Sequence, residues 1–432
     1  MRITHSSLAS IIGTIVATVI SLAFLAFPGQ IKAQDYQLEG LGTFGGQASF
    51  GMAINDGGAM TGYFEIRKSV GVHWHGFVWA DGEEWDTGSV NGTNSWMDDI
   101  NNAGQAVGYS DVGPAEFHAA IWERGVIRSL GTLGGVFSRA RAINDVGVAA
   151  GMSDNANGNA RGCIWWPNGT TTELPTLGGS ESQAMDINER NQVVGFARDF
   201  NNVGRAFFWA KGALFELPSL GDKFTKAEAI NNFGVIAGWS QTADGYFHAV
   251  SWDSSYPVDL GTVGGNNSWA YDINDNGIIV GTSEDANGLL RATVWLPSGP
   301  LDLNSLLASQ DQDWDLRKAF GVNDAGVVVG LGQFKGMPQA WVMRPGGLLL
   351  HAPITWVAPG SIELRAEGAQ PGATISFVDS GTRLVGTAIA DQFGRASWLV
   401  QAPAGTSGRP VNIQAAEAST GRWSPPVVFR QP

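Results

Sequence analysis

Three aspartates occupy the same place in a recurring sequence pattern and carry the side chains best suited to chemistry. Asp99, Asp186 and Asp272 each stand two residues before the Asn of an Ile-Asn pair. Carboxylates gathered around one cavity could hold a cation or act as general acid and base. The same carboxylates could instead bond to nearby backbone, so they are candidate catalytic residues only if they face a shared space.

A second group of polar and aromatic residues falls in expected loops and at the first residues of expected strands. Aromatic rings stack on sugar rings, while carboxylates and carboxamides bond to sugar hydroxyls. Such a face would suit a glycan or a protein partner, although Asp and Asn also occur in loops because turns require them. The candidate residues of this binding face are Trp96, Phe137, Asp154, Asn157, Asp199, Asn267, Trp269, Asp285 and Asn287.

Motifs for other chemistries are missing from the sequence. The segment 272–277 matches the start of a helix-loop-helix calcium loop, but Ser283 stands where that loop needs an acid. Looser calcium binding by Asp154 with Asn157, or by Asp285 with Asn287, stays open, and no other cofactor or metal is expected. There is no Ser-His-Asp signature, no Gly-Lys-Ser/Thr phosphate loop and no His-Glu-x-x-His segment.

The elements that must position these residues follow from an internal repeat. The Ile-Asn pair, Val-Asn in the last copy, recurs seven times at spacings of 43 to 49 residues. A Gly follows each Asn after seven residues, and a Trp follows five of them after twenty-one. The seven asparagines are Asn55, Asn101, Asn144, Asn188, Asn231, Asn274 and Asn323.

Each repeat predicts four short strands. The first ends at Ile-Asn and is joined by an Asn-Asp-x-Gly hairpin, as in 144–147, to a Val-rich second strand. The third carries His/Arg-Ala-x-x-Trp, and the fourth ends in Leu-Gly-Thr-Leu-Gly-Gly. The last repeat lacks a fourth strand, and segment 36–41 can supply it. Closing the ring removes exposed edges, so residues 35–345 are predicted to form a seven-bladed β-propeller, with a solenoid as the alternative.

The repeats resemble the extracellular HAF repeat family, named for a His-Ala-Phe segment before the blade Trp. The resemblance rests on segments 117–119, 205–209 and 247–249 together with the Leu-Gly-Thr-Leu-Gly-Gly and Ile-Asn-Asp-x-Gly motifs, and it covers about 310 residues. It implies an exported bacterial repeat protein and implies no particular chemistry. The second copy departs in its connecting strand, and the seventh lacks the Trp.

One position in the third strand alternates between His and Arg, four residues before the blade Trp. A ring of such groups would look like an anion site. Because the position recurs in nearly every repeat, we expect a structural hydrogen bond within each blade instead. Cys163, the only cysteine, is expected to be a buried and inert core residue.

The two ends of the chain predict further segments. Residues 347–432 carry five to seven alternating strands, which predicts a small immunoglobulin-like β-sandwich. At the other end, an apolar run from Leu8 to Phe27 precedes Ala33, the expected cleavage site of a secretory signal peptide covering residues 1–33. Retention of that run as a membrane anchor is the alternative.

Composition limits the possible functions. The formal net charge is −14 with only 15% charged residues, which argues against a nucleic-acid partner. We therefore expect a secreted, periplasmic or cell-surface protein that is not an enzyme and binds a glycan or a protein partner, touching a membrane only if the anchor is kept. The alternatives are a carbohydrate-active hydrolase or lyase using the three aspartates, and a purely structural envelope component. The repeat is least regular at Arg67–His75 and Ser309–Asp315, which marks the ring seam as a further place to look for function.

Overall fold

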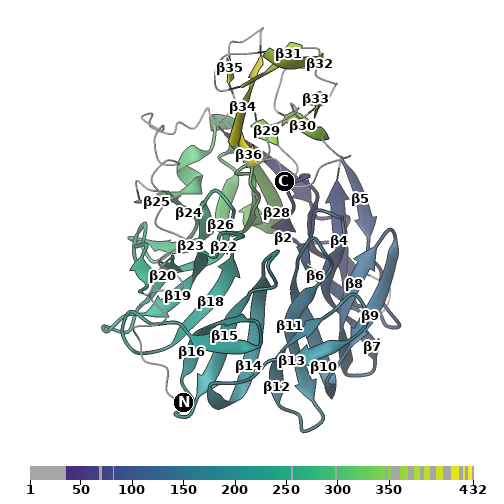
Figure 1. The fold of residues 1–432 in the computed structure, drawn as a ribbon, viewed down its shortest axis with the longest axis vertical. Coiled ribbons are helices and arrows are strands. Elements are labelled where there is room, and N and C mark those ends of the chain that lie inside the picture. Colours follow the sequence, from purple (N-terminus) through teal and green to yellow (C-terminus); the bar gives the residue numbers. More distant parts are fainter. Residues whose placement is uncertain are drawn as a thin grey trace. The chain divides into compact units, whose positions relative to one another are not determined.

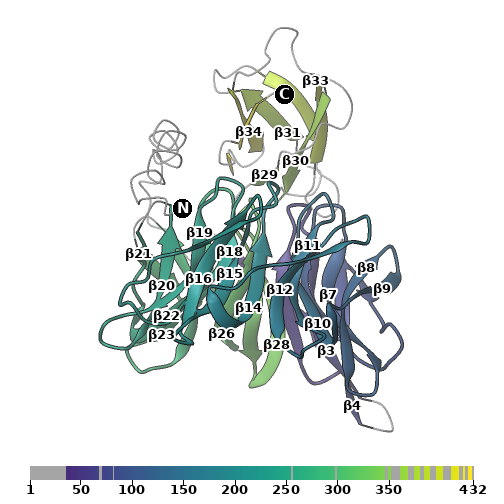
Figure 2. The same ribbon diagram turned by 60° about the horizontal axis from the view of Figure 1, so that its bottom comes forward.

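The computed structural model is an all-β protein that divides into two compact units (Figures 1 and 2). The first unit comprises residues 39–322 and 328–342, and the second comprises 343–432 with the short segments 36–38 and 323–327. The structure describes residues 36–67, 71–80, 82–253, 256–296, 299–345, 349–351, 361–367, 374–379, 384–389, 396–401, 410–417, 422–423 and 427–430. The predicted signal peptide lies outside the described residues. Within the described part, no helix is long and apolar enough to cross a membrane.

Strands of the first unit follow the predicted repeat. Each group of four runs antiparallel, and the groups succeed one another in chain order. The first strands are β2 (Ser49–Ile54), β6 (Ser95–Ile100), β10 (Gly134–Ile143), β14 (Gly178–Ile187), β18 (Thr225–Ile230), β22 (Gly264–Ile273) and β26 (Trp314–Val322). The second strands are β3 (Met60–Arg67), β7 (Ala106–Gly113), β11 (Ala149–Asn155), β15 (Val193–Asp199), β19 (Ile236–Gln241), β23 (Ile279–Asp285) and β27 (Val328–Phe334).

The third and fourth strands, which we call the outer strands, complete these groups. The third strands are β4 (Val72–Ala80), β8 (Glu116–Glu123), β12 (Ala160–Trp165), β16 (Gly204–Ala210), β20 (Phe247–Trp252), β24 (Leu290–Leu296) and β28 (Met337–Pro345). The fourth strands are β5 (Glu83–Asp86), β9 (Val126–Gly131), β13 (Thr171–Glu173), β17 (Ala213–Glu216), β21 (Val258–Asp259) and β25 (Gly299–Asp302). Two short 3₁₀ helices, η2 (Leu303–Leu306) and η3 (Ser309–Asp311), follow β25.

The last group takes its fourth strand from the other end of the chain. β1 (Tyr36–Gly42) pairs with β28 in the sheet β1-β28-β27-β26, as the sequence predicted. The groups β6–β9 and β10–β13 are joined into one sheet by a single parallel bridge between Phe117 and Phe137. One boundary differs from the prediction. Gly134 and Gly135 open the next first strand rather than close a fourth strand, because Gly134 pairs with Asn155.

First strands also pack on one another. Each contacts the first strand of the next group, and β26 contacts β2. Small or apolar side chains at these contacts, such as Ala140, Ala184 and Ala270, are completely buried. Such tight packing lets neighbouring groups approach closely along their first strands, which we call the inner strands.

A repeated asparagine ties neighbouring groups together. Asn144 accepts a hydrogen bond at Oδ1 from the backbone N–H of Val148, four residues on, which fixes its own hairpin (2.9 Å). Its Nδ2 donates to the backbone oxygen of Asn188 in the next group (3.2 Å). The same bond between successive groups joins Asn55 to Asn101, Asn101 to Asn144, Asn188 to Asn231 and Asn231 to Asn274. The Ile-Asn signature is therefore both a turn device and a link between sheets.

The described part of residues 347–432 contains eight strands, against the five to seven that the sequence predicted there. Its two sheets have the orders β29-β30-β33 and β32-β31-β34-β35, with β36 paired to β34. These strands are β29 (Leu349–His351), β30 (Ser361–Glu367), β31 (Thr374–Asp379), β32 (Leu384–Ile389), β33 (Ala396–Gln401), β34 (Pro410–Glu417), β35 (Arg422–Trp423) and β36 (Val427–Arg430).

Candidate functional site: side chains of the inner strands

The three candidate catalytic aspartates each accept hydrogen bonds from two successive four-strand groups. Asp186 accepts a hydrogen bond at Oδ1 from the backbone N–H of Ile187 and at Oδ2 from that of Ile230 on β18, both at 2.7 Å. Asp99 and Asp272 repeat this arrangement on β6 and β22, with bonds of 2.7 to 2.8 Å. The corresponding donors are Ile100 and Ile143 for Asp99, and Ile273 and Val322 for Asp272. One carboxylate thus serves two successive groups, which explains why the aspartates occur in alternate repeats.

Burial also changes the acidity of these carboxyls. Although each side chain keeps some solvent-accessible area, protein atoms surround it densely, and this desolvation raises the pKa of Asp99 to about 7, of Asp186 to about 8 and of Asp272 to about 6. Backbone N–H donors oppose the shift. Asp99 and Asp272 act electrostatically on Asp186 and raise its pKa further, although the three carboxyls come from separate sheets. Carboxyls that titrate near neutral pH could exchange protons with a substrate.

Two candidate acids of the binding face belong to their own hairpins. Asp199 accepts at Oδ1 from the backbone N–H groups of Asn201 and Val203, and Arg205 donates to its Oδ2 (2.8 to 3.1 Å). Backbone hydrogen bonding, chiefly from Val203, lowers the pKa of Asp199. Asp285 makes the equivalent bonds to Asn287, Leu289 and Arg291. Both carboxylates are committed to turn geometry, which favours the structural interpretation of these two residues.

Other polar candidates are placed differently. Asn267 accepts from the N–H of Phe247 and donates to Glu284, so its amide is also used within the fold. Asn157 and Asn287 lie exposed at hairpin tips. Asp154 ends β11 half-buried, and its desolvation raises its pKa. No three His, Cys, Asp or Glu side chains of the described residues are grouped so that they could hold a metal ion.

Aromatic candidates lie on the first strands and not on loop tips. Trp96 stacks on Tyr109 with ring centroids 4.6 Å apart, and Phe137 lies 5.9 Å from the same Tyr109. Trp269, at the place in β22 equivalent to Trp96, is less crowded, with its nearest aromatic ring, Phe247, at 6.4 Å. Each remains half-buried, so part of each ring is available to a ligand.

A bulge in every first strand produces a site that the sequence analysis missed. The pairing of each first strand with its second strand skips one residue, three before the repeated Asn, as at Arg141 between Ala140 and Ala142. Bulges re-aim a side chain and interrupt regular pairing. The seven bulge residues are Met52, Asp98, Arg141, Met185, Glu228, Tyr271 and Phe320.

Chemical variety distinguishes the bulge residues from their neighbours. The residues directly before and after them are Gly, Ala or Asp in every case except Met97, whereas the bulge residues include an acid, a base, an aromatic ring and a thioether. The residues two places earlier vary in the same way: Phe50, Trp96, Arg139, Gln183, Lys226, Trp269 and Lys318. An alignment of the seven repeats would have shown both variable positions, but only the structure shows that they lie on contacting strands.

The charged bulge residues and their neighbours form what we call the inner polar cluster: Asp98, Arg139, Arg141, Lys226 and Glu228. Arg139 makes two bonds to the buried Asp98, at 2.5 and 2.6 Å, and lies over the ring of Tyr109. Lys226 lies 3.0 Å from the Oε1 of Glu228. Arg141 interacts electrostatically with Arg139, Asp98 and Glu228. Since these residues come from β6, β10 and β18, three groups contribute to one cluster.

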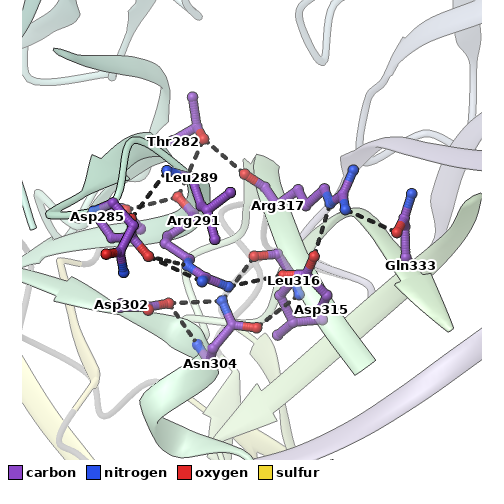
Figure 3. A network of polar contacts seen from close by, with 12 residues as sticks. Thr282, Asp285, Leu289, Arg291, Asp302, Asn304, Asp315, Leu316, Arg317 and Gln333 are labelled. Carbon is purple, nitrogen blue, oxygen red and sulfur yellow. Dashed lines mark hydrogen bonds and ion pairs between the residues drawn. The ribbon is translucent and has the colours of Figure 1, made fainter. Parts of the chain in front are cut away.

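The recurring His/Arg position is structural, as the sequence indicated. His75 and His248 bond to acids of the fourth strands, Asp86 and Asp259. In the sixth group, Arg291 bonds to Asp285 and to Asp315 of β26, and Asp315 also pairs with Arg317, which reaches Gln333 (Figure 3). This chain of ion pairs and hydrogen bonds connects the sixth and seventh groups where the repeat is irregular.

Comparisons with known proteins leave the family open. No protein-family model matches the chain, and no curated protein matches its sequence. Several solved structures bear a distant likeness to it, among them the following three. PorZ, a surface component of the type-IX secretion system of Porphyromonas gingivalis, shares 11% identity over 86% of this chain and 58% of its own, with a TM-score of 0.39.

The other two structures are equally distant. TolB from Acinetobacter baumannii shares 8% identity over 70% of this chain and 66% of its own, with a TM-score of 0.38. A gluconolactonase from Xanthomonas campestris shares 11% identity over 79% of this chain and 94% of its own, with a TM-score of 0.34. This chain thus spans less than two thirds of PorZ and of TolB. At such scores the likenesses carry no argument about function, which must come from the side chains.

Proposed function

We propose that this chain is an exported, non-catalytic glycan-binding protein whose first unit is a closed seven-bladed β-propeller. The four-strand groups supply the blades, and the contact of β26 with β2 supports closure. The fourth strand contributed by β1 supports it further, since it leaves the last blade with the same number of strands as the others. HAF-type repeats, a signal peptide ending near Ala33 and an immunoglobulin-like second unit belong to the same proposal.

One observation carries the binding function. The two positions of the first strands that vary among the repeats place aromatic rings beside charged groups, while the repeated positions around them serve packing. Trp96 and Trp269 offer ring surface, and the inner polar cluster offers hydrogen-bonding groups. Sugar rings need this combination of an apolar face and directed polar partners. Our proposed binding site therefore lies on the inner strands and not on the loop face that the sequence led us to expect.

A glycan array tests this function. We would screen the exported chain, with and without calcium, against Trp269→Ala and a control, Trp85→Ala, which removes a partly exposed tryptophan of β5. We expect specific binding that Trp269→Ala weakens by tenfold or more and Trp85→Ala leaves unchanged. A folded chain that binds no glycan would refute the proposal.

A second candidate function is supported by the acidity of the inner aspartates. Asp99, Asp186 and Asp272 interact electrostatically and have raised pKa values, as acid catalysts of a hydrolase or lyase require. Against it, each carboxylate already accepts two backbone hydrogen bonds. Release of reducing sugar from a bound glycan, abolished in Asp186→Asn, would establish catalysis. Binding without release would leave the first function standing.

A further inference from the structure

Arg141 is a cation without a partner. Its Nε is buried with no hydrogen bond, and among the described residues its guanidinium makes no hydrogen bond or ion pair. Burial lowers the pKa of Arg141, with the nearby Arg139 acting in the same direction. The side chain as a whole is half-buried, so the charge has lost part of its water without gaining a hydrogen-bond partner, and an anion bound there would compensate it.

Its neighbours cannot supply that partner because they are already paired. Asp98 is held by both bonds from Arg139. Glu228 receives Lys226 and also the indole N–H of Trp239, at 2.8 Å. Within this cluster the two acids balance two of the three bases, so a single positive charge remains at Arg141. A ligand group that balances this charge therefore carries one negative charge.

Surrounding residues limit what kind of anion fits. Asp98 and Glu228, which both interact electrostatically with Arg141, would repel a group with two negative charges, such as phosphate, more strongly than a carboxylate. A carboxylate also matches the planar guanidinium fork through two parallel hydrogen bonds. Tyr109 is electrostatically coupled to Arg141 and stacks on Trp96, so aromatic surface adjoins the charge.

We propose that Arg141 binds the carboxylate of an acidic sugar, so that the ligands of this protein are glycans containing uronic acid or a similar carboxylated residue. This assignment rests on the proposed glycan-binding function and specifies its ligand. The sugar carboxylate would complete the pairing of the inner polar cluster, while the ring lies against the aromatic side chains of the inner strands.

The assignment is tested by titrating the chain with glucuronate and monitoring binding by tryptophan fluorescence and calorimetry. Glucose and inorganic phosphate serve as comparison ligands. The variants are Arg141→Met, Arg141→Lys and the control Arg128→Met, which removes an exposed arginine of β9. We expect glucuronate to bind more tightly than glucose or phosphate. Arg141→Met should weaken it on the order of tenfold or more, Arg141→Lys should weaken it less, and Arg128→Met should not change it.

The outcomes separate this assignment from the general function. Equal affinity for glucuronate in Arg141→Met and the unmodified chain, or tighter binding of phosphate, overturns the carboxylate site. Specific array binding of neutral glycans alone also overturns it and leaves the glycan-binding function intact. Should Arg141→Met unfold, Arg141→Lys still decides, since a folded Lys variant with unchanged affinity and unchanged discrimination against glucose contradicts a bidentate site.

Discussion

The carboxylate of Asp186 on β14 accepts a hydrogen bond from the backbone N–H of Ile230 on β18, 2.7 Å away, so one side chain joins two successive sheets. Its other oxygen binds the N–H of Ile187 in its own strand. The bulge before each of these N–H groups interrupts regular strand pairing, and the aspartate supplies the missing acceptor.

Removing this acceptor should weaken the first unit. Asp186→Ala leaves the N–H groups of Ile187 and Ile230 without their present partner, and we expect the free energy of unfolding to fall by about 1–3 kcal/mol at pH 6. Urea denaturation followed by tryptophan fluorescence measures the change. The control is Asp244→Asn, at an exposed turn, which should stay within about 0.5 kcal/mol of the unmodified chain. Equal stability of Asp186→Ala and the control would contradict this role.

Stability should depend on pH between 4 and 8 because of the same carboxyls. The pKa of Asp186 is raised from 3.8 to about 8, so the folded chain keeps this proton at pH values where the unfolded chain has lost it. The contribution of this bound proton to the free energy of unfolding is complete below pH 3.8 and is lost as pH rises through 8. The melting temperature should therefore be lower at pH 8 than at pH 5.5. Asp186→Asn should reduce this dependence, whereas an unchanged slope would show that the proton is held elsewhere.

The repeated asparagine should matter more than an exposed one. Asn144 is buried and bonds to the N–H of Val148 and to the backbone oxygen of Asn188 in the next group. Asn144→Ala removes these two bonds and a third, donated to Oδ1 of Asn191 (2.9 Å), and should cost about 2–4 kcal/mol in the free energy of unfolding. Asn157→Ala, at an exposed hairpin tip, is the matched control and should cost under about 1 kcal/mol. Similar losses in the two variants would refute the link between sheets.

Cys163 should report on unfolding of the first unit. It is completely buried, and burial raises its pKa well above the usual range, so little thiolate forms. A thiol reagent at pH 8 should leave the folded chain unmodified and react at once in denaturant. Prompt reaction in the absence of denaturant would show that the sheet β10–β13 opens readily.

Regular spacing made most of the fold predictable. The Gly three residues after the repeated Asn adopts a positive φ, as at Gly147 (79°), which the hairpin requires, and Asn191 does the same where Gly is absent (54°). The sequence also shows a Gly seven residues after each repeated Asn, but gives no structural reason for it. At Gly195 a Cβ would lie 2.0 Å from the backbone oxygen of Gln183, so no other residue fits without a shift.

The candidate site was less predictable because its residues do not recur. Repetition drew attention to Asp99, Asp186 and Asp272, whose spacing reflects shared hydrogen bonds between sheets. It drew attention away from Arg141, which resembles no other bulge residue. The pairing of Arg139 with Asp98 joins residues 41 positions apart in different four-strand groups, and no local pattern encodes it. Sequence repetition thus finds structural residues most easily, and the unpaired charge emerges only from three-dimensional contacts.

The most direct test of the account is a crystal structure of the chain with glucuronate bound. The account predicts that the sugar carboxylate lies within hydrogen-bond distance of the Arg141 guanidinium, with the ring against aromatic side chains of the inner strands. A ligand found on the hairpin tips, on the outer strands or in the second unit, with Arg141 still unpaired, would contradict it.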